Sequence, residues 1–117
     1  MSNQANDKRI DYIEFPATDV AATRRFYEAV FGWKFEDYGP DYTSFADGRI
    51  AGGFYTVPSM GQAPSALVVI YGADLAALEA KVVEAGGRIV KPVFSFPGGR
   101  RFHFADPSGN ELAIWSE

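Results

Sequence analysis

The chain has 117 residues, of which 47% are hydrophobic and 22% are charged; this is enough for one globular domain with its own core and excludes a wholly disordered chain. Its formal net charge of −4 argues against a nucleic-acid-binding protein, because such proteins need a surplus of lysine and arginine. The chain contains no cysteine, which excludes disulfides, thiolate metal ligands and cysteine nucleophiles.

The N-terminal residues 1–8 are polar and predict a disordered tail ahead of a single domain over residues 9–117. They contain no apolar stretch of the kind found in a secretory signal. The longest apolar run, Ala66–Tyr71, is far too short to cross a membrane. We therefore expect a cytoplasmic protein that contacts neither nucleic acid nor membrane.

The first half of the sequence predicts one helix among four strands. Thr18 or Asp19 can cap a helix with one apolar side, and Gly32 is typical of a left-handed helix end. Pro16 should end the strand that precedes this helix. The predicted strands are 9–16, 33–38, 42–45 and 50–57, with a hairpin turn at Asp47-Gly48 before the last of them.

The second half, after a linker at 58–64, predicts the same order. The unbroken apolar run Ala66–Tyr71 favours a central strand covered on both faces. Asp74 should cap a helix that ends at Gly86-Gly87, and Asp106–Asn110 is a strong turn. The remaining predicted strands are 88–90, 101–105 and 111–115, with a flexible loop at 96–100.

The two halves are related by an internal repeat. Residues 12–15 and 19–22 are echoed by residues 67–70 and 74–77, 55 positions later in each case. A repeated unit of this kind predicts pseudo-symmetric architecture. We expect an α+β fold in which two βαβββ modules, about 9–58 and 64–117, form a curved mixed sheet around a cup-shaped cavity with the helices outside.

Several short motifs, in this order, resemble the vicinal oxygen chelate superfamily of glyoxalase I, bleomycin-resistance proteins and ring-cleaving dioxygenases, and in particular single-domain glyoxalase-related proteins of bacteria. They are Asp19-Val20, Arg25–Tyr27, Phe31–Trp33, Glu84–Gly87 and Phe104–Leu112. The resemblance implies a small-molecule ligand and a homodimer. It is specific for the fold and not for one activity, because function resides in the site.

In metal-dependent members of that superfamily, each module supplies one metal ligand from its first strand and one from its last. The resemblance places these four positions at Tyr12, Leu67, Ala113 and either Gly53 or Phe54. Since divalent metals need several nitrogen or oxygen donors, the resemblance implies that the usual metal centre, and with it any cofactor, is absent.

Six residues are the candidates for a ligand-binding site. If Ala105 pairs with Glu111 across the turn, His103 lies opposite Ala113 and Arg101 opposite Trp115, all on one face. Glu14 shares a strand face with Tyr12. The candidate residues are therefore Tyr12, Glu14, Arg101, His103, Glu111 and Trp115, and no catalytic residue can be assigned.

Each candidate also has a structural interpretation. Glu14 could be a base or an anchor for a cationic ligand, or it could simply pair with an arginine. His103 could be a satisfied structural residue. Arg100 and Arg101 could bind an anion or be edge charges that discourage strand pairing. For Phe94, Phe96 and Phe102 the core is favoured over stacking on a ligand.

The leading hypothesis is a glyoxalase-like small-molecule-binding protein without the usual metal, either a sequestering protein or a metal-independent enzyme. The alternative is a glyoxalase-related lyase or isomerase with a displaced divalent-metal site formed by Glu14, His103 and Glu111. A third possibility is a module that binds a protein partner and no ligand.

Overall fold

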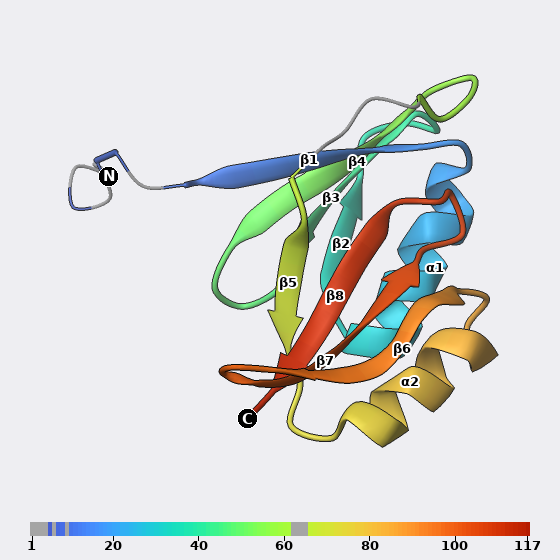
Figure 1. Cartoon of the computed structure of the whole chain (residues 1–117). Coiled ribbons are helices and arrows are strands. Elements are labelled where there is room, and N and C mark those ends of the chain that lie inside the picture. Colours follow the sequence, from blue (N-terminus) through green and yellow to red (C-terminus); the bar gives the residue numbers. More distant parts are fainter. Residues whose placement is uncertain (1–4, 6, 9, 62–65) are drawn as a thin grey trace.

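The computed structural model describes residues 5, 7–8, 10–61 and 66–117. The elements, in order, are β1 (Tyr12–Ala17), α1 (Val20–Phe31), β2 (Lys34–Asp37), β3 (Tyr42–Ala46), β4 (Ala51–Thr56), β5 (Val68–Tyr71), α2 (Leu75–Glu84), β6 (Arg88–Phe96), β7 (Gly99–Ala105) and β8 (Glu111–Ser116). This confirms two βαβββ modules (Figure 1). Most of the predicted tail 1–8 and the end of the predicted linker 58–64 lie outside the described residues.

The eight strands form two four-stranded sheets, one in each module. The N-terminal sheet has the order β1-β4-β3-β2 and the C-terminal sheet has the order β5-β8-β7-β6. In each sheet the first strand of the module is parallel to the last, and the other neighbours are antiparallel. The identical strand orders confirm the pseudo-symmetry and the α+β class that the repeat predicts.

Both helices begin and end where the sequence indicates. The Asp19 carboxylate accepts a hydrogen bond from the Ala22 amide at 3.0 Å, and Asp74 does the same for Ala77 at 3.0 Å. These carboxylates satisfy amides that the first helical turn leaves without partners. Gly32 closes α1 in the left-handed conformation, with φ of 70°, where a side chain would add strain.

An aromatic core lies between α1 and the N-terminal sheet. Tyr27 of α1 stacks on Trp33 with ring centroids 4.9 Å apart and on Phe54 of β4 at 5.0 Å. Phe26 of the same helix instead reaches Phe104 of the other module, at 6.0 Å. Because α1 contributes rings to both modules, burial of apolar surface also holds the modules together.

The turn between β7 and β8 joins the modules through polar contacts. Asp106 accepts hydrogen bonds from the amides of Ser108 and Asn110, each at 2.9 Å, and from the Tyr27 hydroxyl at 3.1 Å. The Asn110 amide group donates to the Pro16 carbonyl at 2.7 Å. Burial raises the pKa of Asp106, and burial and the nearby Asp106 carboxylate raise the pKa of Tyr27.

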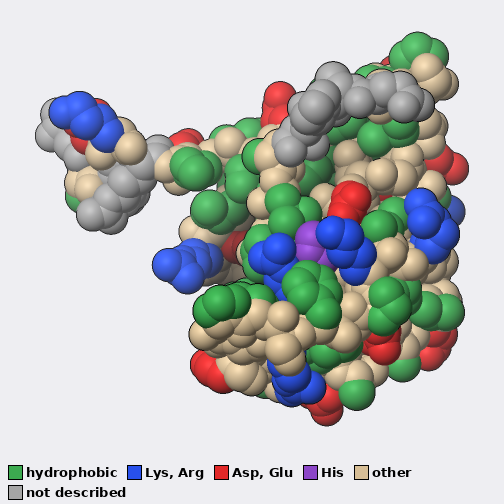
Figure 2. All heavy atoms as spheres, viewed as in Figure 1, with side chains coloured by type: hydrophobic (Ala, Val, Ile, Leu, Met, Phe, Trp, Pro, Cys, Tyr) green, Lys and Arg blue, Asp and Glu red, His purple; other side chains and the backbone are tan. Residues whose placement is uncertain are grey.

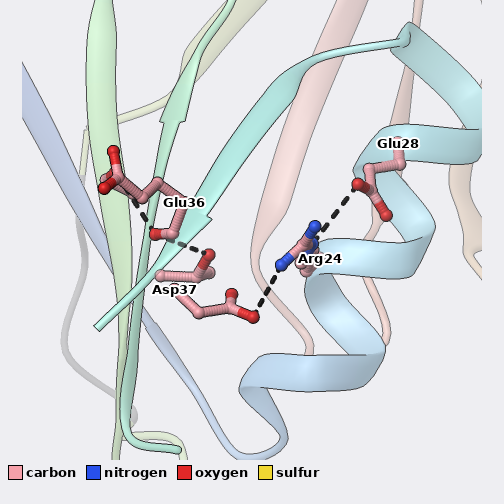
Figure 3. Close-up of polar contacts among 6 residues, drawn as sticks. Arg24, Glu28, Glu36 and Asp37 are labelled. Carbon is pink, nitrogen blue, oxygen red and sulfur yellow. Dashed lines mark hydrogen bonds and ion pairs between the residues drawn. The ribbon is translucent and has the colours of Figure 1, made fainter. Parts of the chain in front are cut away.

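Arg24 links α1 to the edge of the N-terminal sheet (Figure 3). Its guanidinium group lies 2.6 Å from the Asp37 carboxylate on β2 and 3.3 Å from Glu28, one turn further along the helix. The hydrogen bond from Thr43, followed by that from Arg24, lowers the pKa of Asp37. These groups are well exposed, so we expect the ion pairs to add little stability.

Three predicted elements differ from the observed ones. The apolar run at 66–71 forms β5, which is an edge strand and not a central one, with Val69 43% and Tyr71 51% exposed. Strand β1 continues through Pro16 to Ala17, which is possible because an edge strand tolerates proline. The predicted loop 96–100 is a tight connection in which Phe96 already pairs with Gly99, so β6 extends from 88 to 96.

Candidate functional site

Each sheet has one face against its helix and one that turns away from it, which we call the open face. In the C-terminal sheet, Phe102, Phe104, Leu112 and Ile114 are fully buried in the core on the helix side. Side chains alternate along a strand, so the residues between them belong to the open face. These are Arg101 and His103 of β7 and Ala113 and Trp115 of β8.

The register that the sequence predicts for this face is confirmed. Ala105 pairs with Glu111, His103 with Ala113, and Arg101 with Trp115. Four of the six candidate residues, Arg101, His103, Glu111 and Trp115, are therefore brought together on the open face of β7 and β8.

His103 is almost completely buried and is held by a carboxylate. Its exposed fraction is 4%, and its Nδ1 lies 2.8 Å from Oε2 of Glu111. Since a carboxylate can only accept, Nδ1 carries the hydrogen of this contact, and in the neutral ring Nε2 then holds the lone pair. The half-exposed Glu111 thus fixes both the orientation of the imidazole and its tautomer.

Arg101 lies between two aromatic rings of β6. The centre of its guanidinium group is 5.4 Å from the ring centroid of Phe94 and 5.4 Å from that of Phe96. Phe94 also contacts the His103 ring, with centroids 5.7 Å apart. The expectation that Phe94 and Phe96 belong to the core is therefore wrong, although it is confirmed for Phe102.

Irregular pairing in β6 explains why this contact was missed. The register between β6 and β7 shifts between Ile89 and Lys91 and again between Lys91 and Phe94. Such bulges re-aim the side chains that follow them, and they place Phe94 opposite Arg101. Strand β7 also has a neighbour on each side, so the interpretation of Arg101 as an edge charge is wrong.

Two buried polar atoms on this face have no hydrogen-bond partner among the described residues: Nε of Arg101 and Nε2 of His103. A buried polar group without a partner costs about 1–3 kcal/mol, so such groups in native proteins need an explanation. Only 4% of His103 is exposed, and Figure 2 shows this small area with lysine or arginine side chains on both sides of it.

The other two candidate residues form a separate cluster on the open face of the N-terminal sheet. The Tyr42 hydroxyl donates to Glu14 at 2.8 Å and lies 2.6 Å from the Tyr12 hydroxyl, which must then donate to it. Burial, followed by these hydrogen bonds, raises the pKa of Tyr42 well above its ordinary value. Among the described residues, no hydrogen bond or ion pair joins this cluster to His103.

The sequence indicates Tyr42 as an aromatic residue that could line a groove or fill the sheet interior, but it is not one of the six candidate residues. The hairpin could have indicated its place beside Glu14. With the turn at Asp47-Gly48, Ser44 pairs with Gly53, which is also the partner of Glu14 on β1. Tyr42, two positions before Ser44, therefore lies on the same face as Glu14. Beside the cluster is a hollow of about 290 Å³, and Tyr12 is the only candidate residue that lines it.

Comparison with known proteins identifies the family. The sequence profile of the Glyoxalase/Bleomycin resistance protein/Dioxygenase superfamily matches residues 9–114. The chain belongs to this superfamily. The crystal structure of a glyoxalase-related enzyme from Fulvimarina pelagi superposes with a TM-score of 0.78 at 22% identity, over 92% of this chain and 87% of that one.

Proteins with different described roles are also similar to this chain. The bleomycin-binding protein of Streptomyces verticillus, solved with copper(II)-bleomycin, has a TM-score of 0.69 and 22% identity over 94% of this chain and 98% of its own. The anthracycline biosynthesis protein DauV of Streptomyces sp. strain C5 is 31% identical over 89% of this chain. This chain spans less than half the length of DauV (45%) and of CFP32 from Mycobacterium tuberculosis (44%).

The superfamily's metal positions do not fit a metal ion in this chain. Gly53 has no side chain, and the space above it is filled by the hydroxyl of Tyr42, which would lie 2.0 Å from an added Cβ. Ala113 is fully buried, Leu67 is an alkyl group, and Tyr12 is hydrogen-bonded to Tyr42. Nitrogen or oxygen donors are therefore lacking at three of the four positions.

The displaced metal site formed by Glu14, His103 and Glu111 is not assembled either. Among the residues that the structure describes, no three His, Asp or Glu side chains are close enough to hold one ion. Glu14 lies on the other sheet, where Tyr42 donates to it.

The described helices also include none that is long and apolar enough to cross a membrane.

Proposed function

We propose that this superfamily member binds a small organic anion without a metal, against the open face of β7 and β8. The single observation that carries the proposal is a pair of buried atoms on the same face of β7, Nε of Arg101 and Nε2 of His103, that have no hydrogen-bond partner in the part of the chain that the structure describes. A bound molecule with hydrogen-bonding groups would satisfy both atoms and remove their cost.

The chemistry of the face supports a carboxylate as the group that is recognised. Arg101 carries a positive charge that is partly shielded from water by Phe94 and Phe96. Guanidinium groups in such surroundings bind planar carboxylates through paired hydrogen bonds. The neighbouring rings of Trp115 and Tyr71, 5.2 Å apart, provide an aromatic surface for the rest of the ligand.

The proposal can be tested with thermal unfolding in the presence of aromatic carboxylates such as 2-oxo-4-phenylbutanoate and benzoate. At ten times the dissociation constant, binding should stabilise the protein by about 1.4 kcal/mol and raise Tm by about 4–6 °C. The matching neutral amides should have no effect. Addition of EDTA should leave the shift unchanged.

A matched pair of arginine variants locates the site. R101Q should abolish the shift, whereas R100Q should keep it, because Arg100 is exposed and its side chain alternates to the other face of β7. The proposal is refuted if no carboxylate stabilises the wild type, if R100Q and R101Q respond alike, or if EDTA removes the effect.

Cytoplasmic location and a homodimer stay predictions.

A further inference from the structure

We propose that His103 is a general base that removes a proton from the carbon beside the carbonyl group of an aryl-substituted 2-oxo acid, without a metal. This inference rests on the proposed function, because it places the reacting molecule at the same open face. It adds a reaction and a ligand class to that site.

The His103–Glu111 contact has the geometry of an activated base. Nδ1 of His103 is held 2.8 Å from the Glu111 carboxylate, while Nε2 is buried and has no hydrogen-bond partner within residues 10–61 and 66–117 or the other described positions. A carboxylate behind an imidazole fixes the tautomer with its lone pair on the far nitrogen and stabilises the imidazolium that forms after proton transfer. A purely structural histidine of this burial would be expected to have both ring nitrogens paired.

Arg101 is positioned to stabilise the negative charge that such a reaction creates. It lies two residues before His103 on the same face of β7, a separation of about 7 Å between the two Cα atoms. A molecule of a few carbons can therefore contact Nε2 of His103 with one atom and the guanidinium group with another. The low-polarity surroundings of Phe94 and Phe96 strengthen this electrostatic interaction.

The aromatic side chains around the pair define the ligand class. Phe96 and Tyr71 both contact the Trp115 ring, with centroids 6.4 Å and 5.2 Å away. They form an apolar border at the Arg101 end of the face, since Trp115 pairs with Arg101. An aryl group would pack here, with the carboxylate and carbonyl oxygens at Arg101 and the acidic C–H at His103.

The proposed step is balanced without a further reactant. Nε2 of His103 takes the proton from C3 of the 2-oxo acid, and the electron pair of that C–H bond forms the C2–C3 double bond. The carbonyl oxygen becomes an oxyanion beside Arg101. Return of a proton from the imidazolium to C3 restores the 2-oxo acid. In D2O the N–H of the imidazolium exchanges with solvent before this return, so that deuterium is placed at C3.

Side chains around His103 must move to admit the molecule, because Nε2 is buried in the present conformation. Phe94, whose ring centroid lies 5.7 Å from that of His103, is the first candidate to move. Phe94 and Phe96 lie on the part of β6 that follows two register shifts. Bulged strands beside a site are suited to this role, since the ladder is already interrupted there. The core residues of β7 and β8 need not shift.

The experiment follows deuterium incorporation at C3 of 2-oxo-4-phenylbutanoate by proton NMR in D2O. This methylene group has two distinguishable hydrogens once it is bound to a chiral protein. We expect the wild-type protein to exchange one of them selectively, whereas buffer exchanges both equally. Binding of the same compound is measured separately by thermal shift.

The key variant is H103N, because the asparagine amide nitrogen can take the place of Nδ1 and keep the hydrogen bond to Glu111 while Nε2 is removed. It should bind the 2-oxo acid more weakly, because the contact to Nε2 is lost while Arg101 remains. At saturating ligand it should lose exchange by about 10²- to 10⁴-fold, the usual contribution of a general base. R100Q is the matched control and should exchange like the wild type.

Glu111 is a positioning residue in this scheme, and E111Q tests that role. Glutamine keeps an oxygen that can accept the hydrogen bond from Nδ1 but lacks the negative charge that stabilises the imidazolium formed after proton transfer. The E111Q variant should therefore lose exchange while its binding of the 2-oxo acid, measured by thermal shift, persists. A merely structural effect would lower the Tm of the free protein and weaken binding together with exchange.

The outcomes separate this inference from the proposed function. Stereoselective exchange that H103N abolishes while binding persists supports both. Binding without exchange, or exchange that H103N retains, overturns the inference and leaves the binding function in place. Absence of binding overturns both.

Discussion

The buried carboxylate of Asp106 gives the most direct test of how the two modules are held together. Its oxygens accept hydrogen bonds from the Ser108 and Asn110 amides, the Asn110 side chain and the Tyr27 hydroxyl. D106A removes all four acceptor contacts. Asn110 is partly exposed and can turn to water, whereas the Ser108 amide and the Tyr27 hydroxyl are buried.

The expected cost follows from those two buried donors. Each donor left without an acceptor costs about 1–2 kcal/mol, so D106A should lower the free energy of unfolding by about 2–4 kcal/mol. For a domain of this size, that corresponds to a fall in Tm of about 8–16 °C. The charge of Asp106 should add little further stability, because burial raises its pKa and so offsets part of the favourable electrostatic interaction with the donors.

The assay is urea unfolding followed by tryptophan fluorescence, with D47A as the matched control. Asp47 accepts hydrogen bonds from the Arg49 and Ile50 amides at 2.8 and 2.6 Å, but it is exposed. Water can replace its carboxylate, so D47A should cost about 1 kcal/mol or less. If D106A is no more destabilising than D47A, the reasoning that burial decides the cost is refuted.

Three further predictions concern pH, packing and assembly. The stability advantage of the wild type over D106N should grow as the pH falls, because the pKa of Asp106 is raised in the folded state. The stabilisation from this raised pKa is complete below the pKa of the unfolded chain and is lost as the pH rises through the pKa of the folded protein. An advantage that grows with pH in urea titrations would contradict this. G53A should destabilise by about 1–3 kcal/mol, because its Cβ would lie 2.0 Å from the Tyr42 hydroxyl. In the same unfolding assay, the G53A substitution should cost much less when it is made in a Y42A background. G61A, for which no described atom lies within 4 Å of the added Cβ, should change stability by about 0.5 kcal/mol or less. Sedimentation should find a homodimer that V69K converts to monomers, since Val69 is 43% exposed on the β5 edge; a monomeric wild type would exclude that interface.

The local features of this protein could be predicted because neighbouring residues determine them. The caps at Asp19 and Asp74 and the stop at Gly32 depend on hydrogen bonds within one helical turn. The register of β7 and β8, which brings His103, Arg101 and Glu111 to one face, follows from the short turn at 106–110. The internal repeat was sufficient to indicate two equivalent modules, since the same pattern of elements must fold twice.

What the tertiary structure alone decided involves contacts between segments distant in the sequence. The apolar run in β5 predicts a central strand, yet strand order depends on which partners compete for each edge. Of the described strands, β8 alone pairs with β5. The bulges of β6 bring Phe94 to Arg101, and a one-residue shift in pairing cannot be read from composition. Likewise, Tyr42 donates a hydrogen bond to Glu14, which lies 28 positions earlier in the chain. The two side chains can meet because Gly53 has no side chain and leaves room for the Tyr42 hydroxyl. The sequence determined the faces of each strand, whereas long-range packing determined which faces meet.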